Sequence, residues 1–199
     1  MPDGQKVSMI ALGYSGPIEA GERLIAPIRE FGPPLVDLVR PMPYSEMNTL
    51  IDTANPPGQH NYWKWNGLKG VTDEVIDAVV EAFARVPSPQ TAVIIDQLHG
   101  TASRVPADAT AFAHREAPHG LVISSTWTDA ADTEANITWT RELAAATAPY
   151  STGGVYVNSA AGDKAEATYG SNYQRLSAVK AKYDPTNFFR SDQNIKPAS

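Results

Sequence analysis

Short β-branched and aromatic runs alternate along this chain with segments of helical periodicity, and no Gly-rich phosphate-binding turn joins them. The runs have the period of two or the β-branched composition of strands, whereas the segments between them repeat apolar residues every three or four positions. This alternation predicts the α+β class, with one mostly antiparallel sheet and helices packed on one face. A parallel, doubly wound sheet is the alternative. The predicted strands cover residues 7–12, 61–68, 91–98, 121–127 and 153–158, and the predicted helices cover 18–31, 44–53, 72–86, 129–148 and 172–185.

The helix expected at 72–86 has the most complete set of signals. Thr72 is a suitable N-cap, and Pro87 prevents continuation of the helix. Its apolar residues recur at helical spacing, which predicts that they face the core: Val75, Val79, Phe83 and Val86.

Length and charge exclude several classes of protein. The 199 residues allow one large domain, or one domain with an appended segment. The formal net charge of −6 gives no electrostatic reason to bind nucleic acid, and the absence of cysteine excludes disulfides and thiolate metal sites. Because no long apolar stretch or export leader occurs, we expect no membrane span and no Sec-type export, and a cytoplasmic location is favoured.

The sequence lacks the short motifs of dinucleotide, P-loop, zincin and serine-hydrolase sites. Its four histidines are also poorly placed for a metal, because only the run HREAPH puts two of them, His114 and His119, near an acidic residue, Glu116. Ordinary hydrogen bonding by loop histidines is the favoured interpretation. We therefore predict no metal site.

Three rings gather in the run NYWKWNGL, at Tyr62, Trp63 and Trp65. Such rings could line a ligand cleft or belong to the core, and the structural interpretation is favoured two to one. In a strand, Lys64 would point to the face opposite the two Trp side chains. We therefore expect Lys64 to be solvated rather than catalytic.

The run GGVYVN, residues 153–158, combines an apolar and a polar face. A period of two would place Tyr156 and Asn158 on one face, and Val155 and Val157 on the other. An amphipathic surface strand and a binding strand both fit this pattern.

The end of the chain, NYQRLSAVKAKYDPTNFFRSDQNI, closely resembles the C-terminal signature of the berberine-bridge-enzyme-like flavoproteins, which are FAD-linked oxidoreductases of the vanillyl-alcohol-oxidase type. The resemblance extends back through STGGVYVN, through RVPADATAFAHREAPHGLVISSTWTD and through YWKWNGL, in the order that the family shows them. The matching positions of the signature are Asn172, Tyr173, Arg175, Leu176, Val179, Lys180, Tyr183, Asp184, Pro185, Asn187, Phe189 and Gln193.

The resemblance implies that this chain is the second, substrate-domain half of such an enzyme, whose sheet covers a flavin held by an FAD-binding domain. It implies FAD as cofactor, a small-molecule substrate, and the FAD-binding domain as a partner in cis or as a separate subunit. We divide the chain into a flavin-covering α+β domain at 1–160 and a berberine-bridge-type segment at 161–199. The tail after the last helix would return to the FAD-binding domain, and the isolated chain is expected to be inactive.

Site residues follow from matching positions. The resemblance implies that Tyr156 and Asn158 face the flavin and that Gln193 contacts it more weakly. His114 and Arg115 match a pair that we interpret as structural. The family strand that often supplies an acid or amide beneath the substrate offers here only three candidates, namely Val122, Ser124 and Thr126.

Ser159 departs from the family pattern, because many alcohol-oxidising members have Tyr or His at this position to remove the hydroxyl proton. A serine without its own base is too weakly acidic for that task. Either Tyr156, the candidate catalytic residue, takes this role, or the base lies elsewhere. The predicted function is oxidation of an alcohol, sugar or secondary metabolite by hydride transfer to flavin, and the alternative is a non-catalytic binding module with its ligand at Tyr62, Trp63 and Trp65.

Overall fold

The computed structural model describes residues 5–52, 56–159, 165–191 and 193–198. The chain divides into two compact units, Met1–Pro56 and Pro57–Ser199, and each is described by itself.

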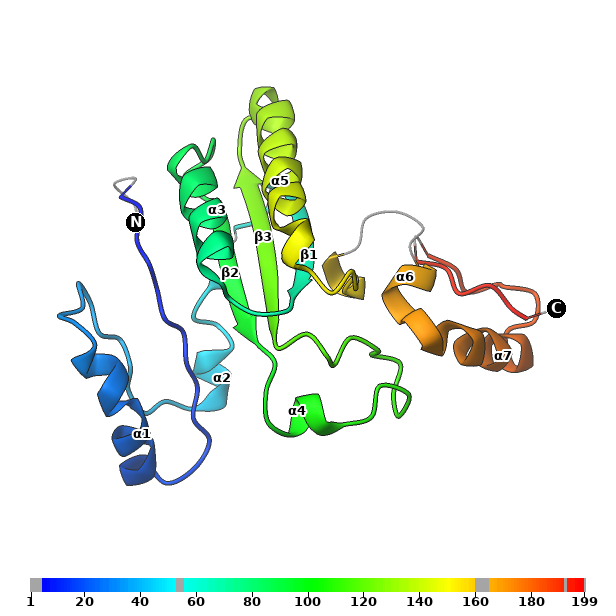
Figure 1. Ribbon diagram of the computed structural model, residues 1–199, viewed down its shortest axis with the longest axis horizontal. Coiled ribbons are helices and arrows are strands. Elements are labelled where there is room, and N and C mark those ends of the chain that lie inside the picture. The colour runs from blue at the N-terminus through cyan, green and yellow to red at the C-terminus, as the bar shows by residue number, and fades with distance from the viewer. Residues whose placement is uncertain (1–4, 53–55, 160–164, 192, 199) are drawn as a thin grey trace. The chain divides into compact units, whose positions relative to one another are not determined.

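The larger unit is built on a three-stranded antiparallel sheet (Figure 1). The strands are β1 (His60–Leu68), β2 (Ala92–Gln97) and β3 (His119–Trp127), in the order β1-β3-β2. The central strand β3 pairs antiparallel with both neighbours, so β1 and β2 are the edge strands. This confirms the predicted α+β class and excludes the parallel alternative for this sheet.

Two helices cover one face of the sheet. Helix α5 (Thr133–Thr147) packs on β1 and β3, and α3 (Asp73–Ala84) packs beside α5 (Figure 1). Both helices were predicted, and α3 begins after Thr72, as expected. The apolar core between the helices and the sheet comprises Leu68, Val75, Leu121, Ile123, Trp139 and Leu143, with the predicted residues Val79, Phe83 and Val86 against it.

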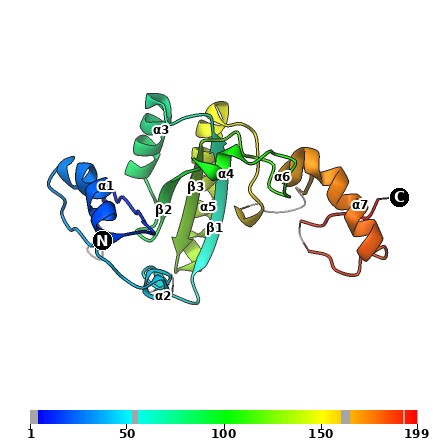
Figure 2. The same ribbon diagram turned by 90° about the horizontal axis from the view of Figure 1, so that it is seen from below.

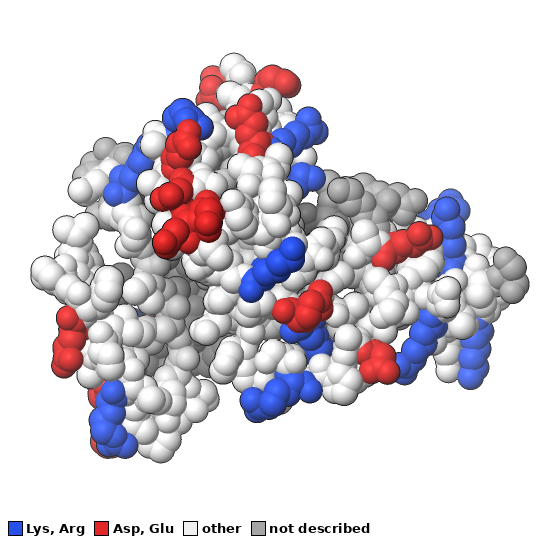
Figure 3. Space-filling view, viewed as in Figure 1, with Lys and Arg blue, Asp and Glu red and all other residues white. Residues whose placement is uncertain are grey.

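The outer surface of α3 is acidic. Figure 3 shows acidic side chains gathered over this helix, which carries exposed carboxylates at Asp73, Glu74, Asp77 and Glu81. The helix thus has the amphipathic character that its sequence predicts, with Val75 fully buried on the opposite side.

The strand predicted at 153–158 is wrong. After Tyr150, the chain makes a single antiparallel bridge to β1, between Leu68 and Ser151, and Thr152 N donates to Gly67 O at 2.7 Å. Gly153 then takes a left-handed backbone conformation, with φ 84°, which ends the extended run. Residues Val157–Ser159 form the 3₁₀ turn η4 instead.

Four further short segments belong to this unit, three of them single turns. They are α4 (Thr101–Arg104), η2 (Ala130–Asp132), η3 (Ala148–Tyr150) and α6 (Ala165–Tyr169). After η5 (Gly170–Asn172) comes α7 (Tyr173–Tyr183), the predicted last helix, and both views place α6 and α7 beyond the β1 edge of the sheet (Figures 1 and 2).

The coil tail folds back along α7. Lys196 N donates to Tyr173 Oη at 3.3 Å, and Ser177 Oγ donates to Lys196 O at 2.6 Å. Ala198 N also donates to Ser177 O at 3.1 Å, so this part of the tail lies against its own helix.

The smaller unit contains α1 (Ile18–Glu30) and α2 (Tyr44–Met47). The strand predicted at 7–12 is wrong, because these residues are coil, and the described part of the unit has no strand with which they could pair. Met9 is 80% exposed and Ile10 63% exposed, so apolar alternation alone did not produce a strand.

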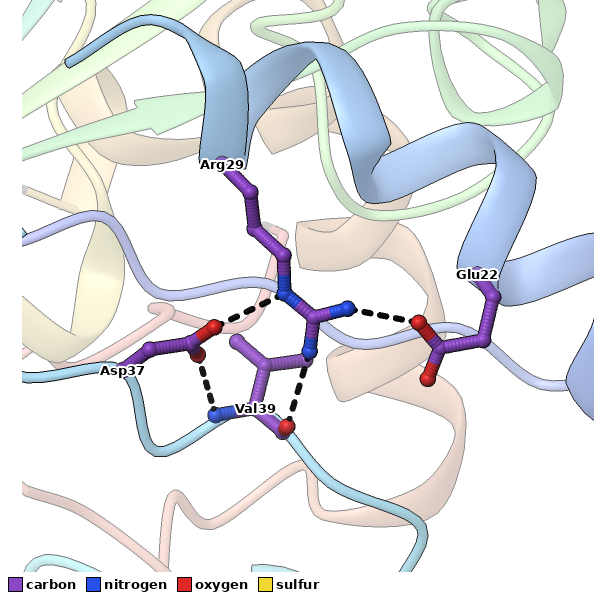
Figure 4. Close-up of polar contacts among 4 residues, drawn as sticks. All are labelled: Glu22, Arg29, Asp37 and Val39. Carbon is purple, nitrogen blue, oxygen red and sulfur yellow. Dashed lines mark hydrogen bonds and ion pairs between the residues drawn. The ribbon is translucent and has the colours of Figure 1, made fainter. Parts of the chain in front are cut away.

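A polar cluster joins α1 to the coil that follows it (Figure 4). Arg29 binds Glu22 at 2.6 Å, Asp37 at 2.8 Å and the carbonyl of Val39 at 3.0 Å. The amide of Val39, with help from Arg29, holds the pKa of Asp37 below its usual value. This unit is therefore organised mainly by charge-assisted hydrogen bonds, and Ile25 is its one buried apolar side chain other than alanine among the described residues.

Candidate functional site

The face of the sheet that α3 and α5 leave uncovered is the candidate site, and we call it the open face. The register defines it, because Ser125 on the other face hydrogen-bonds Thr140 of α5 at 2.6 Å. Successive side chains of a strand alternate between faces, so the even-numbered residues of β3 point to the open face. With their cross-strand neighbours they are Asn61, Trp63, Trp65, Gly67, Ala92, Ile94, Asp96, Gly120, Val122, Ser124 and Thr126.

The Trp65 indole lies against two glycines of the open face. A Cβ built at Gly120 would come within 2.5 Å of Trp65 Nε1, and one at Gly67 within 2.8 Å of Trp65 Cη2. Real Cβ atoms do not approach so closely, so the indole position requires glycine at both neighbours. The backbone of β1 and β3 thus contacts the Trp65 ring directly.

Tyr156 packs against this indole. The Trp65 and Tyr156 ring centroids are 6.0 Å apart, and Phe112 contacts Tyr156 edge-on at 6.1 Å. The amide of Asn158 donates to Tyr156 Oη at 3.0 Å. Tyr156 and Asn158 therefore contact each other at a turn, and not on one face of a strand as the sequence predicted.

Tyr62 does not belong to this group of rings. It pairs with Ser125 on the helix-covered face, and Arg141 of α5 donates to its hydroxyl at 3.2 Å. Burial raises the pKa of Tyr62, but the Arg141 and Lys64 cations outweigh burial and lower that pKa overall. The prediction that Tyr62, Trp63 and Trp65 line one ligand cleft is thus wrong, because successive strand residues alternate between faces.

Lys64 lies on the helix-covered face, opposite Ile123, as expected from the alternation. Its ammonium lies 5.5 Å from the centre of the Tyr62 ring.

The three candidates on β3 all lie on the open face. Thr126 Oγ1 donates to Asn61 Oδ1 at 2.9 Å, which uses its proton within the sheet. Val122 pairs with Trp65 of β1, and Ser124 with Trp63. This strand supplies hydroxyls but no acid.

Asp96 supplies a carboxylate from the neighbouring strand, and sequence reasoning missed it. It pairs with Gly120 across β2 and β3, and so lies on the far side of the glycine that carries the Trp65 ring. It is exposed and is the one ionisable side chain among the strand residues of the open face. The period of two in TAVIIDQL was the available signal, but only the β2–β3 register shows which face it occupies.

His114 and Arg115 hold the loop that joins β2 to β3. His114 Nε2 lies 2.8 Å from the carbonyl of Thr168 in α6. Arg115 donates to Ala102 O at 2.6 Å and to Thr110 Oγ1 at 2.8 Å. These contacts are of the structural kind that was expected for the pair.

Gln193 is half-buried and lies in the tail, three residues before Lys196, whose carbonyl accepts a hydrogen bond from Ser177 of α7. Its flavin contact remains a prediction. The side chain of Ser159 lies outside the described residues.

The C-terminal signature residues fasten this part of the chain. The Asn172 amide donates to the carbonyls of Ala107 and Thr110, at 2.7 and 3.0 Å, and Arg175 donates to Asp108 O at 3.0 Å. The loop between β2 and β3 therefore carries the C-terminal helices.

Asp184 closes the end of α7. It pairs with Lys180 and accepts the amides of Phe188 and Phe189 at 2.8 and 3.0 Å. Lys180 above all, with the two amides, lowers the pKa of Asp184.

Within the described residues, no group of three or more His, Asp or Glu side chains is arranged to hold a metal ion. No helix in the described ranges is both long and apolar enough to cross a membrane.

Comparison with known proteins connects this architecture to a family. Residues 155–196 match the family described as berberine and berberine like. An FAD-linked oxidoreductase of Dictyostelium discoideum is 31% identical over 199 residues, covering 98% of this chain and 43% of that protein. Berberine bridge enzyme-like 17 of Arabidopsis thaliana is 38% identical over 120 residues, covering 50% of this chain and 23% of that protein.

Several solved structures are similar to this chain in fold. A glycopeptide hexose oxidase complexed with teicoplanin superposes with a TM-score of 0.62 at 27% identity, covering 70% of this chain and 33% of that one. BBE-like #28 of Arabidopsis thaliana superposes with a TM-score of 0.72, covering 94% of this chain and 46% of that one, and at 17% identity it supports the fold alone.

Fold and sequence together relate this chain to the FAD-linked oxidoreductases. Residues 155–196 match the berberine-and-berberine-like family, the chain resembles berberine-bridge-enzyme-like proteins, and it spans less than half the length of these relatives.

The open face fits the planar cofactor that is named for the FAD-linked relatives. Two glycines and a flat indole give it an even surface, with Val122 and Ile94 as apolar neighbours. The exposed Asn158 amide provides hydrogen-bonding capacity at one side. A flat, mostly apolar surface with few polar groups is what a ring cofactor requires.

Proposed function

We propose that this chain forms the substrate-side part of an FAD-linked oxidoreductase that oxidises an alcohol, a sugar or a secondary metabolite. The observation that carries the proposal is the open face, where Trp65, Tyr156 and Asn158 adjoin one another on a surface free of covering helices. The remaining part of the enzyme is an FAD-binding domain, in cis or as a separate subunit.

The names of similar proteins support this function. They include FAD-linked oxidoreductases and, among solved structures, a hexose oxidase and a chitooligosaccharide oxidase. Each of these proteins is more than twice as long as the stretch that this chain covers. We therefore assign the proposed activity to the chain together with an FAD-binding domain.

Alcohol oxidation removes a hydride from carbon and a proton from the hydroxyl oxygen, leaving a carbonyl. FAD, when bound, accepts the hydride. This chain's own residues must then orient the substrate and take the proton.

Tyr156 is our catalytic residue because the Asn158 hydrogen bond and the two neighbouring rings hold its phenolic oxygen in one place. Asn158 and Gln193 are proposed cofactor contacts. Asp96 is a second candidate proton acceptor, since its carboxylate lies on the same face, beyond Gly120. Both groups lie on one side of the sheet, so one substrate bound over Trp65 could contact each of them.

The test joins the chain to the FAD-binding domain of a berberine-bridge-enzyme-like relative, either fused or produced as a second polypeptide. We expect a yellow protein with flavin absorption and with flavin reduction by at least one member of an alcohol and sugar panel. A folded assembly that retains no flavin contradicts the proposal. A flavin-loaded assembly that no panel member reduces contradicts the proposed substrate classes.

A further inference from the structure

His114 contacts the chain on both sides of the proposed catalytic segment. Its ring is buried, at 8% exposure, and its Nε2 lies 2.8 Å from Thr168 O. Because a carbonyl only accepts hydrogen bonds, Nε2 carries the proton. This contact ties α6 to the β2–β3 loop.

The other ring nitrogen faces Gly154, two residues before Tyr156. A Cβ built at Gly154 would meet Nδ1 of His114 and would come within 2.7 Å of Cγ. Gly154 has no positive φ, so the close approach of backbone to ring, rather than backbone conformation, is what requires glycine there. The His114 ring is thus in close contact with the backbone of this segment at Gly154.

Ring contacts from His114 through Phe112 to Tyr156 link this contact to the open face. Phe112 contacts His114 edge-on at 6.1 Å and contacts Tyr156 at the same distance. Arg115 lies over the Phe112 ring at 5.3 Å and bonds two other points of the loop. Phe112 therefore cannot move freely to fill space if His114 is removed.

The geometry points to His114 as the positioning residue of the proposed site: it sets where Tyr156 lies against Trp65 by holding Gly154 and α6 together. It touches neither substrate nor cofactor in this role. The meaning for catalysis rests on the proposed function, whereas the placement of Tyr156 does not.

The test uses the whole 199-residue chain and observes Tyr156 directly by NMR. Its ring signals are assigned by their loss in Tyr156→Phe, and their shifts report the nearby Trp65 and Phe112 rings. We expect His114→Ala to move these signals toward free-tyrosine values. His114→Gln keeps an N–H that can reach Thr168 O and should restore the shifts in part. His99→Ala removes an exposed histidine of the same loop and should leave them unchanged.

Gly154→Ala tests the contact from the opposite side without removing the Thr168 bond. We expect it to move the Tyr156 signals while the Trp139 indole signal, which reports the core, stays in place. Unchanged Tyr156 signals in both Gly154→Ala and a folded His114→Ala chain would overturn the inference.

Activity is measured separately in the assembly with the FAD-binding domain. His114→Ala should lower kcat at least tenfold and change KM less, with His114→Gln intermediate. If the wild-type assembly holds no flavin while the NMR shifts respond as stated, the proposed function fails and the positioning role stands. A fully active His114→Ala assembly would refute the positioning role.

Discussion

Trp65 shapes the open face at the scale of single residues. Its indole lies against Gly67 and Gly120, and its ring centroid is 6.0 Å from that of Tyr156. The two glycines are therefore steric requirements of the site rather than turn residues.

Replacing Gly120 by alanine should displace this indole. The new Cβ would lie 2.5 Å from Trp65 Nε1, and overpacking of this kind destabilises a protein by about 1–3 kcal/mol. Urea unfolding measures the loss, and Trp emission reports the displaced ring. Gly70→Ala is the matched control, since nothing lies within 4 Å of a Cβ there. Equal stability of the two variants would contradict the close packing.

Tyr156→Phe separates catalysis from cofactor binding. In the assembly with an FAD-binding domain, it should retain flavin but slow flavin reduction about 10²–10⁴-fold, the range for loss of a proton-transfer group. Stopped-flow absorbance of the flavin gives the rate. Tyr62→Phe is the control, because Tyr62 lies on the opposite face. If Asp96→Asn alone is slow, Asp96 and not Tyr156 accepts the proton.

At the scale of elements, the loop between β2 and β3 anchors the C-terminal helices. Helical periodicity predicted α7, but not what α7 binds. Asn172 and Arg175 reach backbone carbonyls more than sixty residues earlier in the chain.

Asn172→Ala should loosen this attachment. It removes the two hydrogen bonds to the carbonyls of Ala107 and Thr110, and a typical hydrogen bond contributes about 0.5–1.5 kcal/mol. We expect lower stability in urea and faster proteolysis within 165–191. Gln174→Ala alters an exposed neighbour on α7 and serves as control. Equal proteolysis of both variants would argue against the anchor.

The end of α7 should loosen in acid. Because Lys180 and two amides lower the pKa of Asp184 in the folded chain, its carboxylate contributes stability above the unfolded-state pKa. That contribution disappears as the pH falls through the lower, folded-state value. Amide exchange of Phe188 and Phe189 should therefore accelerate in acid, and Asp184→Asn should show fast exchange already at neutral pH. Protection independent of pH in the unsubstituted chain would count against this linkage.

At the scale of the whole molecule, the open face lacks a cover in the described larger unit. Trp63 remains 43% exposed and Ile94 46% exposed on a face of three strands. Apolar side chains on an uncovered sheet face are typical of a surface that meets another body.

Joining the FAD-binding domain should cover Trp63. We expect its emission to fall and its quenching by acrylamide to weaken in the assembly, since a bound flavin and its domain would exclude solvent from the indole. The Trp63→Phe difference spectrum isolates this signal from the other three tryptophans. Unchanged acrylamide quenching in a flavin-loaded assembly would place the flavin elsewhere.

The elements that local patterns predicted correctly carry their signals within their own residues. Helix α3 has its apolar stripe between Thr72 and Pro87, although the Thr72 side chain makes no capping hydrogen bond, and β2 and β3 are β-branched runs. The two wrong strands, at 7–12 and 153–158, had alternation without a partner strand. A strand exists only where a neighbour accepts its hydrogen bonds, and alternation cannot supply that neighbour.

The amino-acid order therefore determined the α+β class, most of the helices and the signature of the C-terminal segment. Folding in three dimensions decided which side of the sheet each side chain occupies: it separated Tyr62 from Trp65, placed Asp96 beyond Gly120, and brought His114 against Gly154. The reason is that periodicity acts over neighbouring residues, whereas strand register and loop contacts depend on groups tens of residues apart whose packing is settled only when the whole core forms.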